Sequence, residues 1–159
     1  MRIALGSDHR GDAALQSLAA ALRKAGHEVA VLFQCNGQSC DYPDGAWRVA
    51  RAVADGEYER GILMCGSGIG VSIAANKVPG IRAAVVCDEL HARLSRAHND
   101  ANVLCMGADI ISAKDANTIA LTWLSTQFEG GRHARRVAKI AAIERGEDPA
   151  SANIDAAVG

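Results

Sequence analysis

Short apolar runs alternate with segments of helical periodicity along this chain, and the alternation constrains its fold more than any other feature. The segment after the first run, for example, places Leu15, Leu18, Ala19 and Leu22 at helical spacing. Strands that alternate with helices in this way form a parallel sheet with helices on both faces. We therefore predict an α/β fold with a five-stranded parallel sheet. The predicted strands are 3–5, 28–33, 62–65, 81–86 and 103–106.

Polar residues ahead of the periodic segments mark the predicted helix starts. Asp44, Asp88 and Ser112 each precede such a segment and are suited to cap its free amides. The last predicted helix, 131–145, has no strand after it, so it is free to pack on a neighbouring subunit. We predict one domain, 1–145, followed by a small polar tail, 146–159, that is disordered or lies on a partner.

Charge and composition exclude several classes of protein. The net charge is -1 at pH 7, so no overall field attracts nucleic acid or an acidic membrane. No apolar run approaches the ~20 residues needed to span a bilayer, and the apolar start is too short for a signal peptide. The 5 cysteines include no C-x-x-C, and their number is odd. We therefore expect reduced thiols in a cytoplasmic protein, not a disulfide framework.

The stretch C-G-S-G-I-G, residues 65–70, follows a predicted strand and opens a helix. A helix N-terminus points free amides outward, so this context favours an anion site. The spacing is not G-x-G-x-x-G, which would indicate a dinucleotide. In open parallel sheets, ligands bind at the carboxyl ends of the strands, which also selects Asp8-His9 and Cys87-Asp88 as candidate walls. The alternative is a tight turn without a ligand.

Cys65 stands where this glycine-rich turn begins. Free cysteine is often only a buried apolar residue, and that interpretation stays open. The neighbouring helix N-terminus, however, favours the thiolate. A thiolate beside a ring of amides can remove a proton while the amides stabilise the resulting oxyanion. A redox role for Cys65 is disfavoured because no resolving cysteine lies at C-x-x-C spacing.

Three further groups of polar residues are candidates, each with a plainer alternative. Asp8-His9 end the first strand, where a simple loop hydrogen bond would also explain them. His98 ends a predicted helix, where a cation interacts favourably with the helix dipole. Arg132 and Arg136 are four residues apart and share one helix face, so they suit a phosphate group unless they only form a solvated face.

Taken together, these stretches resemble the sugar-phosphate isomerase family that contains ribose-5-phosphate isomerase B and the allose-6-phosphate and galactose-6-phosphate isomerases. The resemblance covers nearly the whole chain. The block C-G-S-G-I-G…A-A-N-K followed by H-N-D is its most specific part. The matching stretches are G-S-D-H-R-G (6–11), D-Y-P-D (41–44), 61–83, L-S-R-A-H-N-D-A-N-V-L (94–104) and F-E-G-G-R-H-A-R-R-V (128–137).

The resemblance implies an aldose–ketose isomerase with a Rossmann-like three-layer sandwich and no nucleotide, metal or other cofactor. Cys65 would be the base that moves a proton between C1 and C2 through an enediolate, and His98 would help open the sugar ring. Ser67 would assist the oxyanion-binding amides. The family's active site lies between two subunits, which implies a homodimer or a dimer of dimers. The implied substrate contacts are Asp8, His9, Tyr42, Gly66, Gly70, Asn99, Arg132 and Arg136.

Two departures from the family pattern concern the substrate. Relatives usually carry D-x-G after the second strand, where this chain has Phe33-Gln34-Cys35. Relatives also usually carry G-x-R after the fifth strand, where this chain has Gly107-Ala108-Asp109. An aspartate there repels a phosphate. We expect ribose 5-phosphate or a related phosphosugar as substrate, with Asp109 turned away to pair with Arg10 or Arg135. The alternatives are a different or unphosphorylated sugar, or a binding module without catalysis.

Overall fold

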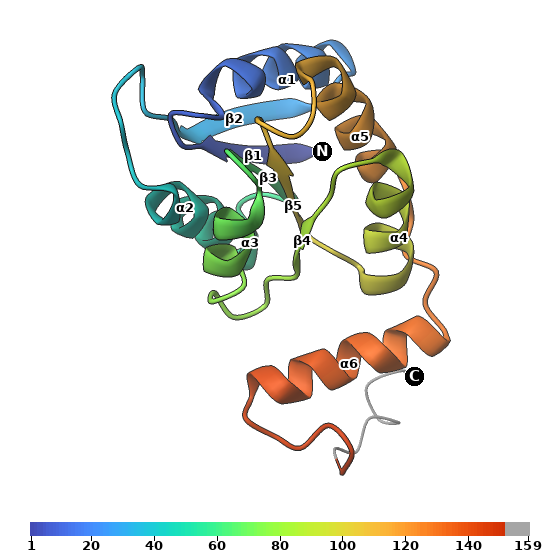
Figure 1. Cartoon of the computed structure of the whole chain (residues 1–159). Coiled ribbons are helices and arrows are strands. Elements are labelled where there is room, and N and C mark those ends of the chain that lie inside the picture. The colour runs from blue at the N-terminus through green and yellow to red at the C-terminus, as the bar shows by residue number, and fades with distance from the viewer. Residues whose placement is uncertain (152–159) are drawn as a thin grey trace.

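The computed structural model describes residues 1–151, which form a three-layer α/β domain with one helix outside the layers (Figure 1). The strands of the sheet are β1 Arg2–Ser7, β2 Glu28–Phe33, β3 Arg60–Cys65, β4 Ala83–Val85 and β5 Val103–Gly107. The helices are α1 Asp12–Lys24, α2 Tyr42–Ala54, α3 Ile69–Ala75, α4 Glu89–Asn99, α5 Ala113–Ser125 and α6 Arg132–Glu144.

All neighbouring strands pair in parallel, in the order β2-β1-β3-β5-β4. The predicted five-stranded parallel sheet is therefore confirmed. Helices α1, α4 and α5 pack an apolar core on one face that includes Leu18, Met64 and Trp123. Helices α2 and α3 cover the other face through Val49, Val71 and their neighbours. This burial of both faces explains why the strands read as continuous apolar runs.

Two predicted boundaries are wrong. The strand predicted over 81–86 pairs with β5 only from Ala83 to Val85, at the edge of the sheet. Asp44 does not cap α2, because that helix begins at Tyr42 and Asp44 lies in its first turn. Pro43 explains the earlier start, since its fixed φ angle and missing N–H suit the first turn of a helix.

The other two predicted caps are confirmed. Asp88 accepts a hydrogen bond from the backbone amide of His91, and Ser112 accepts one from the amide of Asp115. Both capped helices therefore begin just beyond the carboxyl ends of β4 and β5. The amino ends of α4 and α5 thus lie at the same edge of the sheet.

Helix α6 stands apart from the two helical layers, as the orange helix in Figure 1 shows. It packs beside α4 and carries the exposed apolar side chains of Ile140 and Ile143. Of the predicted tail, residues 146–151 are described, and Pro149 accepts a hydrogen bond from Lys139 of α6. Residues 152–159 lie outside the described part of the chain. Among residues 1–151, no helix is both long and apolar enough to cross a membrane.

Candidate active site

The loop between β3 and α3 holds the Cys65 side chain in a defined position. The amide of Gly68 donates a hydrogen bond to Cys65 Sγ over 3.1 Å. Gly68 has a φ angle of 78°, and an added Cβ would lie 2.9 Å from the carbonyl carbon of Met106. Only glycine satisfies both conditions, because other residues rarely adopt that φ and a Cβ would collide with β5. The glycine therefore lets an amide point directly at the thiol.

Backbone hydrogen bonds tie the rest of this loop to the segment after β5. The amide of Ala108 donates to the carbonyl of Cys65, and the amide of Asp109 donates to the carbonyl of Gly66. Ser67 is exposed, and its Oγ accepts a hydrogen bond from the amide of Ile69. The predicted thiol, serine and glycine amides are thus gathered in one rigid turn at the carboxyl edge of the sheet.

Tyr42 and Gly70 meet at the rim of the same turn. An added Cβ on Gly70 would lie 2.6 Å from Tyr42 Cζ, so the tyrosine ring lies directly against this glycine. Tyr42 is half exposed at the first position of α2. The predicted contact residue from the D-Y-P-D stretch therefore borders the loop that carries Cys65.

Asp8 and His9 follow β1, which pairs with β3, and so they lie at the same edge. Asp8 is buried, and its Oδ1 accepts hydrogen bonds from the amides of Arg10 and Gly11. The loop hydrogen bond considered for this pair is thus real. His9 is exposed, with Nδ1 3.4 Å from the carbonyl oxygen of Cys40.

The expectation that all cysteines are reduced is wrong for Cys35 and Cys40. These two residues are joined as a disulfide in the loop before α2, with Cα atoms 5.8 Å apart. The loop returns on itself after the positive-φ residues Asn36 and Gly37, which brings the two cysteines within the range that a disulfide requires. Cys65, Cys87 and Cys105 are free.

The second group of predicted residues gathers where α4 meets α6. The rings of His98 and His133 are stacked in parallel, with centroids 4.1 Å apart. Glu129 Oε2 lies 3.7 Å from His98 Nε2 and 3.6 Å from His133 Nε2. Burial, followed by the nearby His98 and Arg132, lowers the pKa of His133. Arg132 and Arg136 are exposed on α6, next to this cluster in the chain.

Glu129 and His133 complete the cluster around His98, and the sequence analysis missed both. His133 lies inside the basic run R-H-A-R-R, where its burial is not apparent from the sequence. The amide of Glu129 donates to the carbonyl of Ala97, which fixes the segment before α6 against the end of α4. The F-E-G-G-R-H stretch was the available signal, because it places an acid four residues before a histidine.

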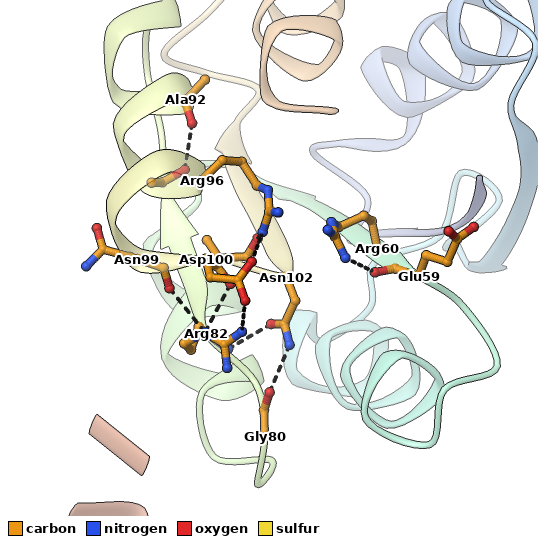
Figure 2. A network of polar contacts seen from close by, with 11 residues as sticks. Glu59, Arg60, Gly80, Arg82, Ala92, Arg96, Asn99, Asp100 and Asn102 are labelled. Carbon is orange, nitrogen blue, oxygen red and sulfur yellow. Dashed lines mark hydrogen bonds and ion pairs between the residues drawn. The ribbon is translucent and has the colours of Figure 1, made fainter. Parts of the chain in front are cut away.

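Asp100 anchors the end of α4 that carries His98 and Asn99 (Figure 2). Its Oδ1 accepts a hydrogen bond of 2.6 Å from Arg96, and its Oδ2 accepts one of 2.9 Å from Arg82. Arg82 also donates to the carbonyl of Asn99. The aspartate of the H-N-D stretch therefore has a structural role in this chain, since it holds the helix end between two arginines.

The two groups lie at opposite edges of the sheet. Cys65 is the last residue of β3, whereas Asn99 contacts Arg82, which directly precedes β4. Strand β3 has 6 residues and is about 17 Å long at a rise of about 3.3 Å per residue. The thiol of Cys65 and the ring of His98 of one chain therefore do not share a cavity.

Asp109 turns to Arg10, which is one of the two partners considered for it. Arg10 Nη2 lies 2.7 Å from Asp109 Oδ2, and Arg10 Nε donates to the same oxygen. An added Cβ on Gly66 would lie 2.9 Å from Asp109 Oδ2, so the carboxylate rests against the glycine-rich loop. The negative charge of Asp109 is thus partly neutralised beside the candidate site.

Known proteins match this chain over nearly its full length. The sequence profile of the Ribose/Galactose Isomerase family matches residues 3–140. Ribose-5-phosphate isomerase B of Escherichia coli is 46% identical over 144 residues, which is 91% of this chain and 97% of that protein.

Solved structures agree with the sequence match. Ribose-5-phosphate isomerase B of Clostridium thermocellum is 50% identical, with a TM-score of 0.90, and the match covers 92% of this chain and 99% of that one. The Mycoplasma genitalium enzyme with bound ribulose-5-phosphate is 39% identical, with a TM-score of 0.83, over 91% of this chain and 96% of that one. The chain therefore belongs to the ribose/galactose isomerase family.

Proposed function

We propose that this protein interconverts ribose 5-phosphate and ribulose 5-phosphate, or a closely related pair of phosphosugars, through an enediolate. The observation that carries the proposal is the Gly68 amide that donates to Cys65 Sγ at the carboxyl edge of the sheet. The names of the E. coli and C. thermocellum relatives agree with the substrate. That the protein acts in the cytoplasm stays a prediction.

The reaction needs one group that moves a proton and another that stabilises an oxyanion. The Cys65 thiolate removes the proton from C2 of the open-chain aldose, and the carbonyl oxygen at C1 becomes the oxyanion. The thiol then returns the proton to C1, and the hydroxyl proton at C2 passes to the oxygen at C1, which yields the ketose. Atoms and charge balance without a cofactor.

The glycine-rich turn supplies what this step requires around Cys65. Amides near Gly66, Ser67 and Gly70 donate to the developing oxyanion, and the Ser67 hydroxyl adds one more donor. Tyr42 lies against Gly70 and borders the substrate. Asp8 keeps one carboxylate oxygen, Oδ2, for a sugar hydroxyl while Oδ1 holds the loop, and His9 is exposed toward solvent nearby.

We further propose that the working site is completed by a second copy of the chain, in a homodimer. The edge of the sheet opposite Cys65 carries His98, Asn99, Arg132 and Arg136. These residues can therefore reach the sugar phosphate bound at Cys65 only from a partner subunit. Exposed Ile140 and Ile143 on α6 support the pairing, since they provide apolar area for a subunit contact. His98 of one subunit would then assist ring opening, and Arg132 and Arg136 would bind the phosphate.

An activity panel tests the proposed reaction. The wild type is incubated with four-, five- and six-carbon aldose phosphates and with free ribose, and ketose formation is followed by absorbance. We expect turnover of ribose 5-phosphate but not of free ribose, and loss of most turnover in Cys65→Ser with substrate binding retained. Full activity of Cys65→Ser would contradict the assignment of the base, and turnover of free ribose would contradict the phosphosugar assignment.

A further inference from the structure

Cys87 and Asp88 were predicted as candidate walls of the anion site, but strand β5 separates β4, which they follow, from β3, which ends at Cys65. With His91, they form a group of three potential metal ligands of different chemistry outside the proposed active site. Cys87 directly follows β4, Asp88 caps α4 and His91 lies in the first turn of that helix. Cys87 Sγ lies 3.8 Å from His91 Nδ1 and 3.9 Å from Asp88 Oδ2, and the last two atoms are 2.8 Å apart. All three side chains are exposed.

The arrangement is not that of a catalytic triad. In a triad, the nucleophile and the carboxylate contact opposite nitrogens of the imidazole ring. Here Sγ and Oδ2 both approach the same atom, His91 Nδ1. This arrangement does not pass a proton through the ring, whereas three donor atoms within 4.8 Å of one another can bind one metal ion.

The triangle of donor atoms fits tetrahedral zinc. Zinc–sulfur bonds of about 2.3 Å and bonds to nitrogen or oxygen of about 2.1 Å give tetrahedral edges of about 3.6 Å to sulfur and about 3.4 Å between nitrogen and oxygen. The observed edges are 3.8, 3.9 and 2.8 Å. Two edges already fit within a few tenths of an ångström. The third is a hydrogen bond that opens when the neutral His91 ring carries its proton on Nε2, so that Nδ1 can bind the metal.

The segment is held in place for this role. Buried Val86 and Ala92 anchor the chain on either side of the three ligands. Asp88 uses Oδ1 to accept the amide of His91, so Oδ2 can bind a metal while the helix cap persists.

A cavity beside the three ligands leaves space for the fourth ligand of a tetrahedral metal ion. It has a volume of about 380 Å³ and lies between the amino ends of α4 and α5. Cys87 and Asp88 line it together with Glu89, Ser112 and Asp115. The extra carboxylates attract a cation, and the open space leaves room for water as a fourth ligand.

The geometry points to a surface site for one thiophilic divalent cation, Zn²⁺, held by Cys87, Asp88 and His91. The thiolate and imidazole select zinc over calcium and magnesium, which prefer oxygen ligands. Binding releases the thiol proton to solvent, so that a thiolate, a carboxylate and a neutral imidazole balance the charge of the ion. The site is independent of the proposed isomerase reaction.

Cobalt titration of the intact protein in the presence of a phosphine reductant tests this site. Co²⁺ should bind one per chain, with visible bands of a tetrahedral complex and a near-ultraviolet sulfur-to-cobalt band, and Zn²⁺ should displace it. Cys87→Ser should abolish the sulfur band, and His91→Gln should raise the dissociation constant at least about tenfold. Both variants should keep wild-type isomerase activity, which separates this site from the active site.

Matched variants locate the cobalt. Cys65→Ser and the double variant Cys35→Ser/Cys40→Ser should keep the sulfur band, because those thiols belong to other sites. No cobalt spectrum, a sulfur band that survives Cys87→Ser, or a band lost in either control would overturn the proposal. Visible bands without a sulfur band, lost in Glu129→Gln, would also overturn it, because they would place the metal at His98 and His133.

Discussion

Replacing Asp100 by asparagine should weaken the fold far more than the same change in an exposed ion pair. Arg96 is only 4% exposed and Asp100 32%, so Asp100→Asn leaves a buried guanidinium without its carboxylate. Breaking a fully buried pair costs about 3–5 kcal/mol. Because Asp100 is partly exposed and Arg96 keeps the Ala101 carbonyl as acceptor, we expect about 2–3 kcal/mol. Asparagine tolerates the φ angle of 46° at this position, so backbone strain adds little.

The Arg51–Asp55 pair is the matched control. It has the same residue types and the same i,i+4 spacing at a helix end, but its side chains are 45% and 47% exposed. Asp55→Asn should cost less than about 0.5 kcal/mol. Urea denaturation of both variants at one protein concentration measures the two changes in the free energy of unfolding. Equal losses would refute the argument that burial of Arg96 makes Asp100 essential.

Two other changes test the active-site account, and a third tests the pH dependence of stability. Asp109→Arg should lower the KM for ribose 5-phosphate about fivefold, as a charge-assisted contact of about 1 kcal/mol implies, and an unchanged or higher KM would contradict this. Gly70→Ala should raise KM because the new Cβ displaces Tyr42, and circular dichroism should show the fold intact. Because the pKa of His133 is lowered in the folded state, the unfolded chain binds more protons below about pH 6.5, so stability should fall as pH falls. His133→Gln should flatten that slope in denaturation curves, and an unaltered slope would exclude His133 as its source.

The layers and the loop of the proposed base were predictable from sequence because they follow local rules. The apolar runs mark the strands, and C-G-S-G-I-G after a strand places Cys65 and its glycines at the carboxyl edge. Asp88 and Ser112 were predicted as caps for the same reason. Each of these conclusions depends on neighbours in the chain.

Contacts between distant segments were not predictable to the same degree. The resemblance to the isomerase family assigned His98 and Cys65 to one active site. Only the sheet topology shows that α4 carries His98 to the edge of the sheet opposite Cys65. The stack of His98 on His133 depends on where α6 packs, which no local pattern specifies. The Cys35–Cys40 disulfide was missed because cysteine count and spacing do not reveal how a loop turns back on itself.

Complementation between two inactive variants tests most directly whether each proposed site combines Cys65 of one subunit with His98 of another. Cys65→Ala and His98→Asn chains are purified separately, mixed, unfolded together and refolded. Random pairing makes half of the dimers mixed, and each mixed dimer has one intact site of two, so activity on ribose 5-phosphate should return to about one quarter of the wild-type level. Each variant refolded alone should stay nearly inactive. No recovery in a mixture that demonstrably contains mixed dimers would contradict the shared site.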